Sequence, residues 1–339
     1  MRFVAAFPIK NLDADFAEQI QMAHAPENSY QVAVSGGRDS MALLHFLHRH
    51  GYRELTVVHV HHGLREEEAD SDEEMVRSFS RQLGYSCVVR KVDVASFSKK
   101  NRLSIEEAAR ELRYNEFAKI AQEHSLPQVF LAHHADDQVE TLLFRFFRGS
   151  GSRGLSGMLP FSRRNIAGVD LELLRPWLQV PREGIDAYVS KNEVPYRDDS
   201  SNEEEFSLRN RIRHRLIPTI NEVFERDVRG AVLRTAELAR RDEACFEEQL
   251  PDLADLPQGN LEVALIRELP PAIRDRVLLR WLRNEGVPDI GFREVERVVR
   301  LAQSSTNPGK ENLPGGIHIR RRQGLLFLEF PGGDSKPKT

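Results

Sequence analysis

Short, uninterrupted apolar runs recur through the first half of this chain, and helical patterns separate them. Runs such as QVAV, LTVVHV and QVFLA are apolar at successive positions, whereas a strand with one wet face alternates apolar and polar residues. Strands buried on both faces favour a parallel sheet with helices on each side. We therefore expect an α/β fold built on a doubly wound parallel sheet. The expected strands cover residues 30–35, 55–60, 86–94, 129–133 and 171–174, and the expected helices begin near Ser40, Asp70, Ser104 and Asp136.

The second half has a different texture, with charged helical patterns in place of apolar runs. Residues 222–249 predict one long helix, or two helices broken near Gly230, and a linker (PDLADLPQGN) follows. The segment IHIRRRQGLLFLEF predicts a hairpin that turns at Gln323 and Gly324. The expected parts are a catalytic domain at 1–218, a second, smaller, mainly helical domain at 219–330 and a disordered tail at 331–339.

The charge balance and the cysteines limit the class of protein. Lys and Arg total 48 against 52 Asp and Glu, a net charge of −4, so binding to nucleic acid has to use local basic patches. The two cysteines, Cys87 and Cys245, fit neither a disulfide framework nor a metal-binding CxxC pair. No apolar run approaches the ~18 residues of a membrane helix. We expect a cytoplasmic protein that does not insert into membranes.

A loop rich in glycine and serine carries the strongest chemical signal. The sequence SGGRDS follows the first apolar run and opens the helix MALLHFLHRH. Glycines let the backbone fold tightly and point successive N–H groups at one anion, and the helix N-terminus adds partial positive charge. The loop lacks the GxxxxGK[ST] pattern of a Walker A motif. The alternative is an ordinary strand–helix turn in which Ser40 only caps the helix.

This loop resembles the pyrophosphate-binding loop of the PP-loop ATPases. The resemblance implies cleavage of ATP between its α and β phosphates, transfer of AMP to a substrate oxygen and release of pyrophosphate. Asp39 would position Mg²⁺, since a carboxylate suits a hard cation. The residues implied in phosphate binding are Ser35, Gly36, Gly37, Arg38, Asp39 and Ser40.

Two further motifs lie where strands are expected to end. HVHHGLR closes the second apolar run and brings His59 and His61 to the sheet edge that binds nucleotides in open α/β folds. Three close histidines are also compatible with zinc, although hydrogen bonding is the commoner role of such residues. In AHHADDQVET, His133 ends a strand, and Asp137 and Glu140 share a helix face. A di-metal hydrolase could use the same residue types, but the phosphate loop argues against it.

Arginines form the remaining motifs. EEAARELRY places Arg110 and Arg113 on one helix face, and RNRIRHR holds four arginines without an interleaved acid. Neutralising phosphates is the main source of affinity for nucleic acid, so such clusters are candidate binding surfaces. The alternative is that these arginines are solvated or paired with glutamates. The candidate nucleic-acid-binding residues are Arg209, Arg211, Arg213, Arg215, Arg320, Arg321 and Arg322.

In chain order, SGGRDS, HVHHGLR, AHHADDQVET, RGSGSRGLSGM and DDSSN…RNRIRH resemble the tRNA(Ile)-lysidine synthetases. The resemblance runs from Ser35 to about Pro218 and more weakly to residue 330. It implies that free L-lysine is joined to the wobble cytidine of an isoleucine tRNA with a CAU anticodon, through an adenylated tRNA, with ATP and Mg²⁺ as cofactors. The lysidine so formed pairs with A, which changes the tRNA from methionine to isoleucine identity. Trp177 stands at an aliphatic position of LRPWL, and many relatives carry a second C-terminal domain after the first.

The resemblance implies separate roles for the site residues. Arg113 suits the lysine carboxylate, because a guanidinium matches a carboxylate with two hydrogen bonds. A histidine or carboxylate of AHHADDQVET is the candidate to bind or deprotonate the lysine ammonium. The expected catalytic residues are Asp39, Arg113, His133, Asp137, Glu140 and Arg209.

Two other functions are left open. An ammonia-dependent NAD synthetase is the enzymatic alternative, although it would not need RNRIRHR. A non-catalytic RNA-binding protein with a relic nucleotide site is the alternative from another class. The related tRNA thiolases generally carry sulfur on cysteines, whereas Cys87 and Cys245 are expected to be buried in a strand and a helix. A homodimer is also left open.

Overall fold

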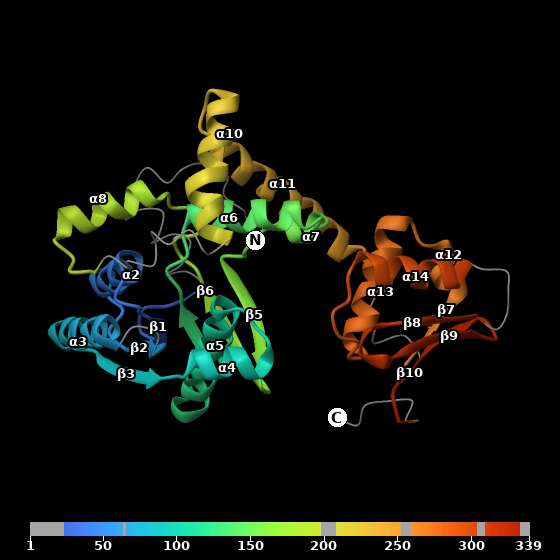
Figure 1. The fold of residues 1–339 in the computed structure, drawn as a ribbon, viewed down its shortest axis with the longest axis horizontal. Helices are drawn as coiled ribbons and strands as arrows, with labels where there is room; N and C mark the ends of the chain where they lie inside the picture. Colours follow the sequence, from blue (N-terminus) through green and yellow to red (C-terminus); the bar gives the residue numbers. More distant parts are fainter. Residues whose placement is uncertain (1–23, 64–65, 198–207, 252–258, 304–308, 333–339) are drawn as a thin grey trace. The chain divides into compact units, whose positions relative to one another are not determined.

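A computed structural model of the chain describes residues 24–63, 66–197, 208–251, 259–303 and 309–332. The chain divides into two compact units, Met1–Arg240 and Arg241–Thr339 (Figure 1). The first unit therefore extends beyond the boundary that we expected at residue 218.

A six-stranded sheet forms the centre of the first unit. Its strands are β1 (Tyr30–Ala33), β2 (Leu55–His61), β3 (Ser86–Lys91), β4 (Gln128–Phe130), β5 (Phe161–Ile166) and β6 (Val169–Leu174). They lie in the order β3-β2-β1-β4-β6-β5, and neighbouring strands are parallel except for β5 with β6. The expected doubly wound parallel sheet is confirmed, and β1, β3 and β4 are shorter than expected.

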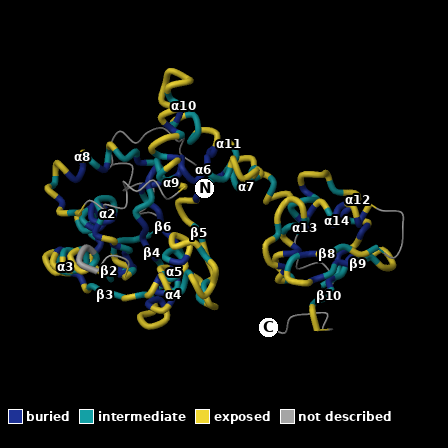
Figure 2. The backbone as a smooth tube through the Cα atoms, in the orientation of Figure 1, coloured by how far each residue is buried: buried dark blue, intermediate teal, exposed yellow. Residues whose placement is uncertain are grey.

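Helices cover both faces of this sheet (Figure 1). The helices of this part of the chain are α2 (Arg38–Arg49), α3 (Glu66–Gln82), α4 (Val94–Asn101), α5 (Ile105–His124), α6 (Ala135–Phe147), α7 (Ser152–Leu155) and α8 (Arg182–Asn192). On one face, Val32 of β1 belongs to a core with α2 and Trp177, and on the other face Val129 of β4 belongs to a core with Phe117 of α5. Buried residues follow β4 and β6 through the middle of the unit (Figure 2). Trp177 is 1% exposed, with its ring centroid 5.5 Å from that of Phe46, so the indole fills the core.

The antiparallel strand β5 is a feature that the sequence did not predict. Its residues, FSRRNI, are mostly exposed and polar, so they lack the apolar run that marks the other strands. β5 forms a hairpin with β6, and the turn uses Ala167 and Gly168 with φ of 49° and 85°.

Further helical segments end the first unit. They are α9 (Leu208–Arg211), the π-helix η3 (Ile212–Leu216), α10 (Ile217–Phe224) and α11 (Arg229–Glu248). The expected helix at 222–249 is two helices, and Gly230 lies inside the second one rather than at the break. Val232 and Leu233 of α11 pack in one cluster with Val139 and Leu143 of α6, which explains why the unit continues past residue 218. The motif DDSSN belongs to residues 198–207, which lie outside the described residues.

The second unit combines helices with a four-stranded antiparallel sheet of order β7-β10-β9-β8. Its elements are β7 (Asn260–Glu262), α12 (Val263–Glu268), α13 (Pro271–Asn284), α14 (Phe292–Gln303), β8 (Gly309–Asn312), η5 (Pro314–Gly316), β9 (His318–Arg322) and β10 (Leu325–Glu329). The expected hairpin is β9 with β10, and Gln323 and Gly324 form its turn with φ of 52° and 79°. We expected a mainly helical domain with this single hairpin. In the structure β7 and β8 flank the hairpin and extend it to a four-stranded sheet. Residues 333–339 of the expected tail lie outside the described residues.

The helices present one buried and one wet face. In α14, Val295 and Val298 are buried while Glu296 is exposed. Cys245 lies on the wet side of α11 and is exposed, contrary to our expectation that both cysteines are buried. Within the described residues, no helix has both the length and the apolar composition that crossing a membrane requires.

Candidate active site

The neighbouring strands β1 and β4 lie at a reversal of strand order, since the chain first builds the sheet toward β3 and then continues on the other side of β1. In open α/β sheets, ligands bind at such a reversal, beyond the carboxyl ends of the strands. Here β1 leads into residues 35–40, and β4 leads into His133 and His134. Nε2 of His134 lies 3.6 Å from Oδ2 of Asp39, so the two loops meet at this edge.

The loop after β1 closes on itself through two serines. The N–H of Ser35 donates to Oγ of Ser40 over 3.1 Å, and this hydroxyl donates to the carbonyl oxygen of Gly37 over 2.9 Å. Because α2 begins at Arg38 without a side-chain cap, Ser40 lies within the helix and does not cap it. An uncapped helix N-terminus can bind an anion through its backbone N–H groups.

Gly36 and the segment after α8 fix the shape of this loop. Gly36 has a φ of 98°, and a Cβ there would lie 3.2 Å from Cβ of Asp72 on α3, so a side chain would meet both strain and crowding. The carbonyl oxygen of Gly36 accepts the N–H of Arg197 over 3.1 Å, and Nε of Arg197 lies 3.0 Å from Oδ1 of Asp72. These contacts hold the loop against α3.

Arg38 directs its side chain away from the loop. Its Nη1 donates to Oδ1 of Asp186 over 2.7 Å, and its guanidinium lies 4.7 Å from the centre of the Tyr196 ring. The Arg38 side chain thus packs on α8 and the segment after it. The expectation that Arg38 binds phosphate is thereby limited to its backbone N–H.

His134 lies among three carboxylates. Its Nε2 is 3.6 Å from Asp39 and 3.5 Å from Asp137, and its Nδ1 is 3.6 Å from Oδ2 of Asp136. Burial alone would lower the pKa of His134, but the hydrogen bonds and charges of these carboxylates raise it to about 10. Burial alone would raise the pKa of Asp39, but the imidazolium of His134, together with the charges of Arg182 and Arg38, lowers it. Sequence reasoning selected His133 and missed this neighbouring residue, although both belong to the same motif.

Asp39 keeps one carboxylate oxygen without a protein contact. Its Oδ2 faces His134, whereas Oδ1 is buried and has no hydrogen-bond partner among the described residues. A buried carboxylate oxygen is costly unless a donor or a cation meets it. Beside the uncapped N-terminus of α2, this oxygen fits Mg²⁺, which binds proteins through one or two carboxylates together with substrate phosphates.

Asp137 and Glu140 share a helix face as expected, but they meet an arginine there. Nε of Arg213 in η3 donates to Oε1 of Glu140 over 2.6 Å, and its Nη2 lies 3.7 Å from Oδ1 of Asp137. Burial raises the pKa of Glu140, and Arg213 opposes this effect. The Glu140 side chain is 2% exposed and the Asp137 side chain 18%. Glu140 therefore holds Arg213, and Asp137 is the more accessible carboxylate.

Arginines surround His133. Burial lowers the pKa of His133, and the charges of Arg175, Arg110, Arg209 and Arg113 lower it further, so the imidazole is neutral. Its Nδ1 is buried without a hydrogen-bond partner in the described part of the chain. Arg113 is exposed to solvent although the surrounding protein lowers its pKa. This edge of the sheet therefore carries a concentration of positive charge that suits an anion.

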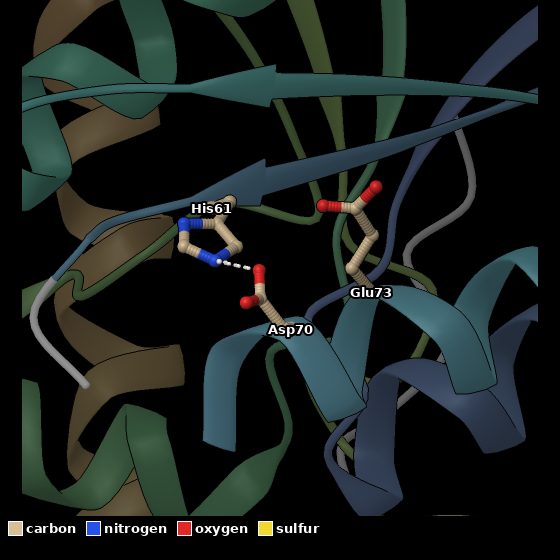
Figure 3. Close-up of side chains that lie close together, drawn as sticks. All are labelled: His61, Asp70 and Glu73. Carbon is tan, nitrogen blue, oxygen red and sulfur yellow. Dashed lines mark ion pairs between the residues drawn. The ribbon is translucent and has the colours of Figure 1, made fainter. Parts of the chain in front are cut away.

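The histidines of HVHHGLR are tied into the sheet edge. Both His59 and His61 are buried, and Nδ1 of His59 lies 2.9 Å from the carbonyl oxygen of Val34. Figure 3 shows His61 facing Asp70 and Glu73 of α3, with Nε2 of His61 3.2 Å from Oδ1 of Asp70. The expected contact of His59 and His61 with a nucleotide stays a prediction.

His61, Asp70 and Glu73 lie close enough together to hold a metal ion, but this group contains one of the three histidines on which the zinc alternative rested. Nζ of Lys91, however, lies 3.3 Å from Asp70 and 3.7 Å from Glu73, and Nε of Arg77 lies 2.8 Å from Glu73, so both carboxylates already pair with cations of the protein. Nδ1 of His61 accepts the N–H of Gly63 over 3.2 Å. This bond places the ring proton on Nε2, the atom that a metal would need. The contacts favour hydrogen bonding over metal binding.

The arginines expected to bind RNA differ in how far carboxylates neutralise them. Arg213 pairs with Glu140, Arg320 pairs with Glu329 over 2.7 Å, and Arg209 lies 3.7 Å from a carboxylate of α5. The acid that pairs with Arg213 comes from α6, so the lack of an acid within RNRIRHR did not leave this arginine unpaired. Arg321 is half-buried, and Arg211, Arg215 and Arg322 are exposed.

A cavity of about 380 Å³ lies behind the carboxylates, between α6 and α11. Apolar side chains that include Val139 and Leu233 line it. Nη1 of Arg229 lies 2.8 Å from Oδ1 of Asp136 and 3.1 Å from Oε1 of Glu183 at its rim. No sequence pattern predicts this pairing, because Arg229 and Asp136 are 93 residues apart.

Two protein-family descriptions match the chain. Residues 11–220 match a PP-loop domain, and residues 261–327 match a TilS substrate binding domain. The first match covers the sheet with its phosphate loop, and the second covers most of the second unit.

Curated proteins and solved structures are also similar to this chain. A tRNA(Ile)-lysidine synthase from Chlorobaculum tepidum is 36% identical over 315 residues, which cover 90% of this chain and 92% of the relative. Another, from Solibacter usitatus, is 32% identical over 308 residues, which cover 88% of this chain and 67% of the relative. The U34-tRNA thiolase NcsA from Methanococcus maripaludis, solved with its 4Fe-4S cluster, has a TM-score of 0.54 at 14% identity, with 68% of this chain and 80% of that chain covered. At this identity the structural likeness concerns the fold alone.

Proposed function

Since the chain belongs to the tRNA(Ile)-lysidine synthase family, we propose that it joins free L-lysine to the wobble cytidine of an isoleucine tRNA with a CAU anticodon. The proposed reaction passes through an adenylated tRNA and converts ATP to AMP and pyrophosphate. One observation carries it: the uncapped helix N-terminus of the phosphate loop, the Asp39–His134 contact and the arginines around His133 meet at one sheet edge.

The chemistry explains why these parts belong together. The C2 carbonyl of cytosine is a poor electrophile, and its oxygen is a poor leaving group. Transfer of AMP to that oxygen breaks the bond between the α and β phosphates of ATP and releases pyrophosphate. Attack of the lysine ε-amine on C2 then expels AMP. Both steps need positive groups near phosphate oxygens. The N-terminus of α2 and the arginines around His133 would supply them.

Asp39 is the residue that would hold Mg²⁺. The ion, when bound, neutralises phosphate charge during the transfer. The Asp39 carboxylate divides its two oxygens between His134 and the position of the cation, so His134 orients it.

Lysine has to lose a proton before it attacks. The pKa of its ammonium is ~10.4, so deprotonation at pH 7 costs about 3.4 pH units, or roughly 4.6 kcal/mol. A positioned general base contributes about 10²–10⁴-fold to a rate, which is the order required. Asp137 is our first candidate because Arg213 occupies Glu140, and His133 is the second because its imidazole is neutral. Arg113 suits the lysine carboxylate.

The tRNA is the expected macromolecular partner. We expect Arg211, Arg215 and Arg322 to contact its phosphates, because their side chains are exposed. A cytoplasmic place of action and a homodimer remain predictions, and sedimentation would test the second.

A single incubation tests the proposed function. The protein is mixed with ATP, Mg²⁺, L-lysine and an unmodified isoleucine tRNA with a CAU anticodon, and the tRNA nucleosides are then analysed by mass. We expect lysidine, with AMP and pyrophosphate in equal amounts. A transcript with uridine at the wobble position is the matched control and should yield none of the three. Synthesis of NAD from ammonia without lysidine would favour the NAD synthetase alternative.

A further inference from the structure

The C-terminal end of α6 exposes two adjacent aromatic rings. Phe146 and Phe147 are 60% and 65% exposed and meet edge to face, with ring centroids 5.3 Å apart. Isolated exposed apolar residues are normal, but neighbouring large ones in contact mark interaction sites. The proposed reaction gives neither ring a role.

Both rings continue faces of α6 that lead to the candidate active site. Phe147 follows Glu140 by seven residues, so the two share a helix face about 10 Å apart along the axis. Phe146 follows Val139 by the same interval, and Val139 packs on Ile212 of η3. The aromatic pair therefore lies at the outer end of the helix whose inner end carries the site carboxylates.

Positive charge accompanies the pair. Arg148 is exposed, and its guanidinium lies 4.2 Å from the centre of the Phe144 ring. Arg145 donates to the carbonyl oxygens of Gly154 in α7 and of Gly157 just after it, over 3.0 Å and 2.8 Å. Glu107 lies within electrostatic range of Arg148, but its carboxylate is engaged with Ser104 in the cap of α5. Arg148 thus remains available to an external anion.

Exposed aromatic rings beside arginines are suited to unpaired RNA. Bases stack on the rings whatever their identity, while guanidinium groups reach the phosphates. A second copy of this chain fits less well, because stable protein interfaces bury about 1,200–2,000 Å² and a pair of rings supplies a small part of that.

We propose that Phe146 and Phe147 form a stacking wall for anticodon-loop bases that neighbour the base held in the active site. A stacked strand advances about 3.4 Å per nucleotide, so it covers the 10 Å from Glu140 to Phe147 in about three nucleotides. An anticodon loop presents unpaired bases over such a span. This inference rests on the proposed function, because that function makes an anticodon loop the occupant.

Substitutions of the full-length chain separate stacking from general apolar contact. The probe is a synthetic stem-loop RNA with a CAU anticodon loop, and its dissociation constant is measured by fluorescence anisotropy. Phe147→Ala should weaken binding by about 5- to 150-fold, and Phe146→Ala similarly. Phe147→Leu should weaken it almost as much, since leucine keeps the apolar contact but has no aromatic face. Phe147→Trp should keep an affinity close to that of the wild type, because it retains an aromatic face. The fluorescence of the introduced indole should fall when RNA binds.

Two controls accompany these variants. Phe224→Ala removes a ring that is 58% exposed at the end of α10, and it should leave RNA affinity unchanged. A stem duplex that lacks the loop should bind every variant equally. Thermal unfolding checks that each variant is folded.

Several outcomes would overturn the stacking wall. Unchanged affinity of both alanine variants would do so, and so would full affinity of Phe147→Leu. Loss of a dimer without loss of RNA affinity would assign the pair to a second copy of the chain. Lysidine formation by the wild type combined with unchanged RNA binding by the variants would refute this inference alone. If the wild type forms no lysidine, the proposed function fails, and the RNA measurements still decide the role of the rings.

Discussion

Asp39 has a different task for each of its carboxylate oxygens. Asp39→Asn keeps the size of the side chain but removes the charge that would bind Mg²⁺. We expect pyrophosphate release in the presence of tRNA to fall by about 100-fold or more, the size of effect seen when one charge-stabilising group is lost. Asp186→Asn is the matched control, because it frees Arg38 from α8 without touching the loop carboxylate, and it should retain most of the activity. Near wild-type turnover of Asp39→Asn would contradict the metal role.

Glu140 and Asp137 should differ when each is neutralised. Glu140→Gln leaves the half-buried Arg213 without its carboxylate, and we expect a loss of about 2–4 kcal/mol in the free energy of unfolding, below the full cost for a buried pair because Arg213 is partly solvated. Both half-reactions should slow. Asp137→Asn should cost less stability and should slow lysine transfer more than tRNA adenylation. Urea unfolding and rapid-quench detection of adenylated tRNA measure these effects, and identical behaviour of the two variants would count against the assignment.

His134 makes the stability of the site depend on pH. Its pKa is raised from 6.5 to about 10 in the folded protein, so the charged ring stabilises the fold fully below about pH 6.5, and this contribution is lost as the pH rises through 10. Part of the loss is offset, because the neutral ring can accept the N–H of Asp136 over 3.2 Å and cap α6. The free energy of unfolding, measured in EDTA between pH 7 and 10, should fall more steeply in the wild type than in His134→Gln. Parallel curves would show that the ring carries no charge in this range.

At the scale of single residues, the sequence motifs indicated which side chains belong to the candidate site, but not which of them form ion pairs with one another. The motifs that contain Asp39 and His133 meet at one edge of the sheet, where His134 lies 3.6 Å from Asp39. Arg213 looked unpaired because no acid lies near it in sequence, yet its partner is 73 residues away. Ion pairs between two helices depend on how the helices pack against each other, and a local sequence pattern does not contain that information.

At the scale of elements, the motif RGSGSRGLSGM depends on one side chain of α6. Nε2 of Gln138 donates to the carbonyl oxygen of Met158 over 2.9 Å, and Oε1 accepts the N–H of Met158 over 2.7 Å. Gly157 has a φ of 70°, and a Cβ there would lie 2.5 Å from Nε2 of Gln138. Gly157→Ala should therefore lower the free energy of unfolding by about 2–4 kcal/mol, through backbone strain and the displaced amide.

Gly149 supplies the control for this prediction. Its φ of 74° is similar, but a Cβ there would meet no atom of the described residues within 4 Å. Gly149→Ala should thus cost about 1 kcal/mol, the backbone strain alone. Chemical denaturation compares the two variants, and equal losses would show that the contact with Gln138 has no energetic weight.

The strands show which patterns carry information about elements. Continuous apolar runs marked β1, β2 and β4, because burial on both faces leaves a clear signature, whereas β3 is half-buried and β6 alternates polar and apolar residues. β5 and β8 were not predicted, because their sequences, FSRRNI and GKEN, are mostly polar and partly or fully exposed. Such strands are recognised through their partners, and the partner is known only when the chain is folded.

At the scale of the whole chain, the last motif lies about 25 residues before the end of the first structural unit, at Arg240. RNRIRHR suggested a boundary at residue 218, but Val232 and Leu233 of α11 still pack with the first unit, while Phe246 of the same helix packs with the second. The helix crosses the boundary after Arg240. A run of charged helical residues has no break to mark such a boundary, so sequence texture could not locate it.

The balance of charge over the chain leads to a last prediction, on tRNA binding. A protein with a net charge of −4 has to bind a polyanion through local arginines, and each phosphate contact releases counterions. Arg322 is exposed, so Arg322→Gln should weaken tRNA binding and reduce the slope of log K against log salt by up to about 0.9. Arg320→Gln is the comparison: Glu329 already lies 2.7 Å from Arg320, so this change should have a smaller effect on the slope.

Dissociation constants for tRNA between about 50 and 200 mM salt measure both slopes. ATP affinity should be unchanged in either variant, since the phosphate loop belongs to the other unit. The reverse order, with Arg320 dominant, would mean that tRNA displaces Glu329 on binding. If both variants keep the wild-type slope, phosphates do not contact this end of the hairpin, and the RNA-binding surface has to be sought at Arg211 and Arg215, whose own variants would then carry the salt dependence.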